Sequence, residues 1–230
     1  MTTLNAALYQ QRLLKFIEQV TIYPVSCEKL ACGRNDEEWL DAVLAGGARI
    51  VQLRDKLSDD RTLFAKAQVF RSKTAEAGAL FMVNNRLDIA LLAEADGIHL
   101  GNSDLPAREV RRLAPNLLIG VSANTREQAA SAKARGASYY NIGPLFPTLT
   151  KSGLSTFLGE EAITGFSAES DLPFTVMGGI KLEHVPSLTA LGASRIAVVT
   201  ALTQAENITE ETGRWIAAIN RGKDSGRKQK

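Results

Sequence analysis

Residues 148–152 bring several side chains that can bind an anion into one short segment. Thr148, Thr150, Lys151 and Ser152 follow an apolar run and a Gly-Pro pair. Three hydroxyl groups and one ammonium group can each donate hydrogen bonds to phosphate oxygens. The same residue types are common in ordinary polar turns. The segment alone leaves a phosphate site and a polar turn open, so the surrounding chain must decide.

A second group of polar side chains ends an earlier apolar run. Gln52, Arg54 and Lys56 occupy every second position, and in a strand this spacing puts them on one side. Two of the three are cationic, which predicts a clamp for an anion. The alternative is a solvated strand end in which Asp55 forms an ion pair.

Oxygen-bearing side chains follow the next two apolar runs. Asn84, Asn85 and Asp104 carry hard oxygen atoms, and Mg²⁺ bridging to a diphosphate needs only one or two protein ligands. Asn85 and Asp104 are therefore candidate metal ligands. Capping is the alternative for both, because Asn and Asp are common at helix N-caps and Pro106 suits a helix start.

Further candidates lie at the ends of later apolar runs. Ser122 ends the fifth run, and Asn124 after it fits a helix cap. Gly179 follows the seventh run, and Val199 and Thr200 close the eighth. In barrels of eight strand–helix units, the loops after strands seven and eight often bind phosphate through glycine amides.

The elements that must position these residues alternate between strands and helices. Eight runs read as strands: 20–25, 48–54, 79–83, 97–100, 117–121, 139–142, 174–177 and 195–199. Their consecutive apolar residues are typical of parallel strands buried on both faces. The pattern predicts an α/β fold, a (β/α)8 TIM barrel. An open doubly wound sheet is the alternative, but a Gly-x-Gly-x-x-Gly motif after the first strand is missing.

Two regions flank the barrel. Residues 5–20 have the apolar spacing of an amphipathic helix, which we expect to pack across one end of the barrel. We expect residues 1–222 to form a single domain and residues 223–230 to form a disordered basic tail. Asn35 and Glu38 form a capping-box pattern that predicts the start of the next helix.

Composition excludes several classes of protein. The 230 residues include 27 basic and 25 acidic ones, so the net charge of +2 gives no case for a nucleic-acid or membrane partner. A signal segment is missing, and we expect a cytoplasmic protein.

Cys27 and Cys32 come with no metal-binding cluster and are expected as reduced thiols. His99, in an apolar strand, is expected to be a buried partner rather than a base, and no hydrolase triad is recognisable.

Six motifs, in the same order, resemble those of the thiamine phosphate synthase family: Gln52–Lys56, Asn84–Asp88, Gly97–Asp104, Gly120–Ser122, Gly143–Lys151 and Gly178–Ile180. The likeness spans residues 20–220 or so. It implies a barrel enzyme that joins a pyrimidine methyl diphosphate to a thiazole ethyl phosphate and releases pyrophosphate. It also implies Mg²⁺ as the cofactor, with small-molecule substrates as partners and a homo-oligomer left open.

The resemblance assigns the candidate residues to the two substrates. It implies that one set holds the pyrimidine and its diphosphate: Gln52, Arg54, Lys56, Asn84, Ser122 and Lys151. Within that set it implies that catalysis rests on Arg54, Lys56, Ser122 and Lys151. It places the thiazole phosphate at Thr148, Thr150 and Gly179, and Mg²⁺ at Asp104 with Asn85.

Three positions depart from the family pattern. Asn85 stands where a metal-binding Asp is usual, Asn102 where Gln is usual and Asn124 where His is common. Two alternatives follow. A thiazole tautomerase resembles this pattern but depends on a His at position 124 and lacks the Lys at position 56, so both features point away from it. A non-catalytic barrel that binds a phosphate ligand is the other, since position 85 has no carboxylate.

Overall fold

Eight parallel strands form the centre of the molecule. The structure of the chain, a computed structural model, describes residues 3–148 and 156–227. Within them the strands are β1 (Ile22–Pro24), β2 (Ile50–Leu53), β3 (Leu80–Asn84), β4 (Gly97–Leu100), β5 (Leu118–Ala123), β6 (Tyr139–Ile142), β7 (Phe174–Val176) and β8 (Ile196–Val198). Each expected strand is therefore confirmed, with shorter bounds for β1, β2, β7 and β8.

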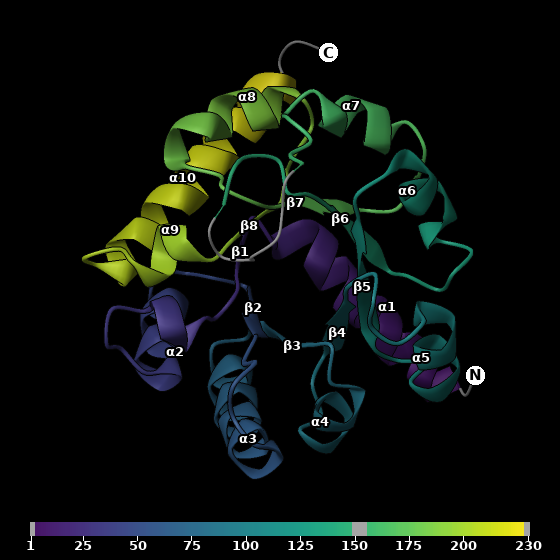
Figure 1. The fold of residues 1–230 in the computed structure, drawn as a ribbon, viewed down its shortest axis with the longest axis vertical. Coiled ribbons are helices and arrows are strands. Elements are labelled where there is room, and N and C mark those ends of the chain that lie inside the picture. Colours follow the sequence, from purple (N-terminus) through teal and green to yellow (C-terminus); the bar gives the residue numbers. More distant parts are fainter. Residues whose placement is uncertain (1–2, 149–155, 228–230) are drawn as a thin grey trace.

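The sheet closes on itself. Seven neighbouring pairs run in the order β1-β8-β7-β6-β5-β4-β3-β2. The two strands at the ends of this order, β1 and β2, meet just after β1, where Val25 forms a bridge to Gln52. The Ser26 amide also donates a 2.9 Å hydrogen bond to the Gln52 carbonyl. Figure 1 shows the resulting ring of strands with helices outside it. The (β/α)8 barrel is confirmed, and the open doubly wound sheet is wrong.

Helices connect successive strands and cover the outside of the barrel. They are α2 (Asp36–Ala45), α3 (Asp60–Glu76), α4 (Leu87–Leu92), α5 (Ala107–Leu113), α6 (Arg126–Ala132), α7 (Ala162–Ser167), α8 (Val185–Ala190), α9 (Thr200–Thr203) and α10 (Ile208–Arg227), with 3-10 turns η1 (Glu28–Leu30) and η2 (Leu182–His184). The Asn35–Glu38 capping box at the start of α2 is confirmed. Over the described residues, no helix is both long and apolar enough to cross a membrane.

The first helix, α1 (Thr3–Gln19), closes the amino end of the barrel, as expected. Figure 1 shows it crossing behind the strands. Phe16 is fully buried, and its ring stacks on Tyr139 with a centroid distance of 4.5 Å. The Arg195 guanidinium donates to the carbonyls of Phe16 and Ile17, at 3.0 and 2.6 Å. Because free carbonyls at a helix end need partners, Arg195 fixes where α1 ends.

The expected disordered tail needs a correction. Helix α10 continues to Arg227, so residues 223–227 are helical, while residues 228–230 lie outside the described part. Buried Trp215 and Ile219 anchor this helix. Once a helix is anchored, each further residue adds a hydrogen bond at little cost, so a charged end can extend it.

Side chains inside the barrel change from apolar to polar along the strands. The layer nearest α1 is apolar and packs on Phe16; it consists of Ile50, Leu80, Leu118 and Tyr139. Two and four positions further along β2 and β3 the inward residues include amides and cations. The apolar layers make a packed floor, and the polar ends leave room above it. Any ligand site must therefore lie at the carboxyl ends of the strands.

Gly120 gives a test of this packing. A Cβ atom at position 120 would collide with the Tyr139 ring and lie 2.7 Å from Nδ1 of His99. We expect Gly120→Ala to lower the free energy of unfolding by roughly 1–3 kcal/mol, since overpacking forces buried side chains to move. Urea denaturation measures this.

Gly213→Ala is the matched control. Gly213 lies in α10, and the nearest atom to an added Cβ is 4.0 Å away. Alanine there should stabilise the protein by up to about 1 kcal/mol because it is a better helix former. A Gly120→Ala variant as stable as the parent protein would contradict the packing described for the barrel interior.

Candidate active site

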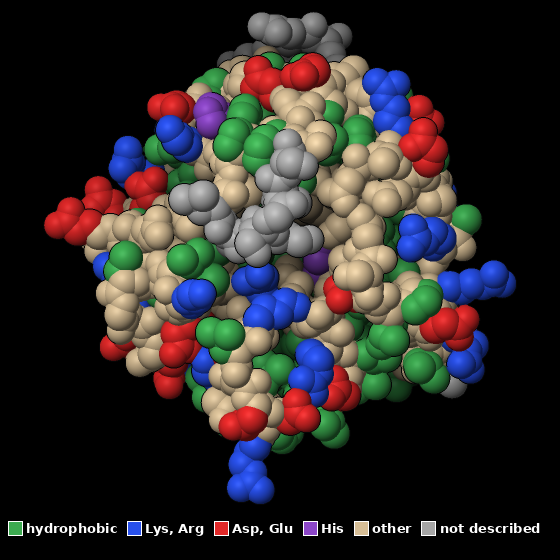
Figure 2. Space-filling model, in the orientation of Figure 1, with side chains coloured by type: hydrophobic (Ala, Val, Ile, Leu, Met, Phe, Trp, Pro, Cys, Tyr) green, Lys and Arg blue, Asp and Glu red, His purple; other side chains and the backbone are tan. Residues whose placement is uncertain are grey.

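A cavity of about 770 Å³ opens at the carboxyl ends of the strands. Residues from the ends of all eight strands line it. Figure 2 shows this face hollowed near its centre, with Lys and Arg side chains along one side of the hollow. Its size suits a small-molecule ligand.

The polar end of β2 supplies one wall. Gln52, Arg54 and Lys56 all line the cavity, as their alternate spacing predicted. Asp55 lies between the two cations in sequence, but its carboxylate pairs with Lys66 at 2.8 Å. The alternative is met in part: the Asp55 ion pair is present and Lys56 is exposed, whereas Gln52 is only 4% exposed and all three residues line the cavity.

The candidate metal ligands lie together. The Asn85 side-chain amide donates a 3.0 Å hydrogen bond to one Asp104 oxygen, and the Gly101 amide donates to the other at 2.6 Å. The expected caps are wrong: the N-caps of α4 and α5 are Arg86 and Pro106. Asn85 instead adopts a left-handed backbone with φ of 52°, which Asn tolerates better than most residues.

A chain of hydrogen bonds crosses the floor of the cavity. The Asn84 amide donates to Gln52 at 3.0 Å, and the Gln52 amide donates to the Tyr23 hydroxyl at 2.9 Å. The Tyr23 and Tyr139 hydroxyls lie 3.0 Å apart. These contacts hold the Gln52 amide in one orientation.

His99 continues the chain to Ser122. Its Nδ1 lies 3.3 Å from the Tyr139 hydroxyl, and its Nε2 lies 3.2 Å from the Ser122 hydroxyl. Burial of the ring lowers the pKa of His99 to about 4. The imidazole is therefore neutral near pH 7 and serves as a hydrogen-bond partner, as expected. Sequence reasoning missed Tyr23 and Tyr139; their inward positions on β1 and β6 were the available signal.

Asn124 joins two loops. Its side-chain amide donates to the Gly143 carbonyl, and its oxygen accepts a 2.5 Å hydrogen bond from Asn102. The expected cap by Asn124 is wrong, because Thr125 caps α6 in a box with Gln128. An amide in this place has no proton to exchange near neutral pH, so it cannot act as a base.

Glycine amides and hydroxyls form the opposite wall. Gly179 and its neighbour Gly178 have φ values of 63° and 102°. A Cβ at Gly179 would meet the Phe146 carbonyl at 2.8 Å, so the turn has room only for glycine. Thr148, Val199 and Thr200 line the same cavity. The candidates Thr150 and Lys151 lie outside the described residues.

Known proteins resemble this chain over most of its length. A family model described as thiamine monophosphate synthase matches residues 22–202. The thiamine-phosphate synthase of Methanocella arvoryzae is 37% identical over 210 residues, covering 91% of this chain and 99% of the relative. That of Myxococcus xanthus is 41% identical over 182 residues, covering 79% and 84%.

A solved structure shares the fold. The thiamine phosphate pyrophosphorylase from Pyrococcus furiosus superimposes with a TM-score of 0.83 at 29% identity, covering 91% of this chain and 99% of that one. Family model, relatives and fold agree with the six motifs in the sequence. The chain belongs to the thiamine monophosphate synthase family.

Proposed function

We propose that this protein is a thiamine-phosphate synthase. In that reaction the C–O bond between the pyrimidine methylene carbon and the diphosphate breaks, and the thiazole nitrogen forms a bond to the same carbon. Pyrophosphate leaves with the bonding electrons. The observation that carries the proposal is one cavity that holds two cations, a row of amides and a glycine turn in a member of this family.

The leaving diphosphate is assigned to the β2 wall. It gains negative charge as the C–O bond breaks, and cations already in place stabilise that charge. Arg54 and Lys56 supply the cations, and Asn84 lies beside them on the cavity wall. Lys151 joins them in the proposal through the family resemblance.

The Asn85–Asp104 pair carries one negative charge, and its oxygens suit Mg²⁺. Asp104 offers a carboxylate that lines the same cavity as Arg54 and Lys56, and rotation of the neighbouring Asn85 amide would turn its oxygen toward Asp104. One or two such ligands suffice when a diphosphate supplies the others. When bound, Mg²⁺ neutralises charge on the leaving group.

The pyrimidine is assigned to the floor. Gln52 can hydrogen-bond a ring nitrogen or an amino group, and Ser122, held by His99, lies on the far side of the same chain of hydrogen bonds. The thiazole phosphate is assigned to Thr148, Thr150 and Gly179, with Val199 and Thr200 beside them. Such an arrangement brings the nitrogen and the methylene carbon together, and positioning is the main requirement of this chemistry.

The alternatives explain less. A thiazole tautomerase would need a proton-transfer group at position 124, and the Asn124 amide is held by Gly143 and Asn102. A non-catalytic binding barrel would use the same cavity without turnover. A product assay separates that alternative from the synthase.

The assay supplies both phosphorylated substrates and Mg²⁺ to the purified chain. We expect thiamine phosphate and pyrophosphate to form in equal amounts, because one C–O bond breaks for each C–N bond made. Chromatography and a pyrophosphate assay measure them. A folded protein that binds pyrophosphate but forms no product would be a binding barrel instead.

Replacing Arg54 tests the clamp. We expect Arg54→Met to reduce kcat by about 10²–10³-fold, as for other groups that stabilise developing charge, with a small change in Tm. Steady-state kinetics measures this. Arg61→Met, an exposed change on α3, is the control and should leave kcat unaltered. Equal kcat for both variants would remove Arg54 from the diphosphate site.

Replacing Asn85 tests the metal site. In Asn85→Asp a second carboxylate replaces the amide that now donates to Asp104. We expect Tm without metal to fall because the two carboxylates repel each other, and Mg²⁺ to restore it. Calorimetry with pyrophosphate should show Mg²⁺ binding about tenfold tighter. Unchanged Tm and Mg²⁺ affinity would show that position 85 does not face the metal.

A further inference from the structure

Lys66 lies among three carboxylates directly behind the β2 wall. Its ammonium group contacts Asp36 at 2.9 Å, Asp55 at 2.8 Å and Glu28 at short range. These acids come from separate elements: the start of α2, the β2–α3 loop and η1. The Asp36 and Asp55 side chains are only 4% and 9% exposed. Two buried carboxylates of this kind are costly unless a cation and hydrogen-bond donors compensate them.

The cluster is connected to the clamp through Asp55. The Asp55 carboxylate accepts hydrogen bonds from the amides of Leu57 and Ser58, from the Ser58 hydroxyl and from Lys66. It is thereby held on the side away from the cavity, while the residues before and after it, Arg54 and Lys56, line the cavity.

The β1 side of the clamp is held as well. The Arg54 amide donates a 3.0 Å hydrogen bond to the buried Ser26 hydroxyl, and one guanidinium nitrogen lies 3.9 Å from the Cys27 sulfur. Glu28, the next residue, binds Lys66. Lys66 therefore joins the β1 and β2 loops at the place where Arg54 leaves the barrel wall.

Lys66 supplies a positive charge that contacts all three carboxylates. Burial would lower the pKa of Lys66, but its three carboxylate partners raise it, so it stays protonated. Burial raises the pKa of Asp36 to about 6 despite its contact with Lys66. The Lys66 hydrogen bond lowers the pKa of Glu28. The oxygens of the three acids lie close enough together to hold a metal ion, and the Lys66 ammonium occupies the place between them.

We propose that Lys66 is a positioning residue of the diphosphate site: it holds Glu28, Asp36 and Asp55, so that these carboxylates do not draw Arg54 and Lys56 out of the cavity. The inference rests on the proposed function, since it assigns the diphosphate to those two cations. Without Lys66, two or three uncompensated carboxylates would lie beside the clamp and compete with the anionic ligand for its cations.

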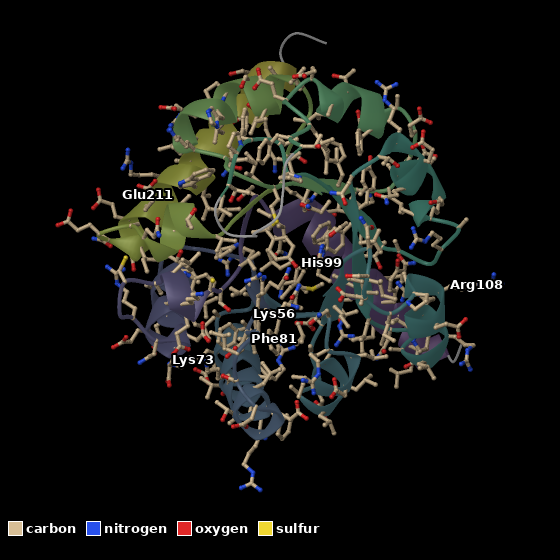
Figure 3. All side chains as sticks on the ribbon, in the orientation of Figure 1. Lys56, Lys73, Phe81, His99, Arg108 and Glu211 are labelled. Carbon is tan, nitrogen blue, oxygen red and sulfur yellow. The ribbon has the colours of Figure 1, made fainter. Side chains whose placement is uncertain are left out.

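Lys73 offers a matched control. It lies two helical turns further along α3 and pairs with Glu37 and Asp41 of α2, at 3.1 and 2.7 Å. It therefore makes the same kind of helix-to-helix contact as Lys66. Figure 3 shows it at the periphery, away from Lys56 and His99 near the centre of the barrel. Loss of Lys73 should affect stability without reaching the clamp.

The experiment measures inorganic pyrophosphate binding by calorimetry in the presence of Mg²⁺, together with KM for each substrate. For Lys66→Met we expect the Kd of pyrophosphate and the KM of the diphosphate substrate to rise about tenfold or more. The KM of the thiazole phosphate should stay within about threefold of that of the parent protein. Lys73→Met should leave all three constants unchanged. The diphosphate-specific change separates positioning from a general loss of stability.

A triple variant keeps the inference testable if Lys66→Met does not fold. Lys66→Met/Asp36→Asn/Asp55→Asn removes the cation together with the two buried carboxylates. It should bind pyrophosphate within about threefold of the parent protein, because the two buried competing carboxylates are gone and the remaining one, Glu28, is exposed to solvent. A tenfold loss in this folded triple variant, or parent-like binding in folded Lys66→Met, would overturn the inference.

The outcomes also separate the inference from the proposed function. A parent protein that binds pyrophosphate but makes no thiamine phosphate contradicts the function, while a selective loss of binding in Lys66→Met still supports the role of Lys66. If the parent protein does not bind pyrophosphate, the proposed diphosphate site is itself contradicted. That result overturns the inference too.

Discussion

Closure of the barrel between β1 and β2 is the constraint on which the site depends. The Ser26 amide bonds to the Gln52 carbonyl, and two residues later the Arg54 amide bonds to the Ser26 hydroxyl. These contacts fix the direction in which β2 leaves the barrel. Gln52, Arg54 and Lys56 then reach the cavity on the same side, because a strand alternates its side chains. A sheet left open at this edge would give these cations no fixed place.

The floor of the cavity combines two roles. Below, Phe16 of α1 and the apolar layer fill the barrel, and above them the tyrosine hydroxyls and the neutral His99 satisfy one another. Buried polar groups tolerate such a position only when they are hydrogen-bonded. The same bonds fix Gln52 and Ser122, so under the proposed function a substrate ring would meet groups that are already oriented. Stability and the proposed recognition would then share one set of contacts.

Sequence patterns predicted the fold and much of the cavity wall because both follow from short-range rules. Alternation along β2 placed Gln52, Arg54 and Lys56, and the two-glycine turn placed Gly179. Local rules failed where two explanations fitted the same residues. Asn85 and Asn124 resemble helix caps, yet each bonds to a loop that comes later in the chain, to Asp104 and to Gly143. Lys66 looks like any polar residue on a helix, since its acidic partners come from separate elements.

The central claim is that the leaving diphosphate lies between the β2 cations and Asp104. A crystal structure with pyrophosphate and Mg²⁺ tests it most directly. We expect pyrophosphate oxygens within hydrogen-bonding distance of the Arg54 guanidinium and the Lys56 ammonium, with the metal ion bridging to Asp104. Pyrophosphate bound only at the glycine turn of Gly178 and Gly179, with Arg54 and Lys56 making no contact to it, would contradict the claim.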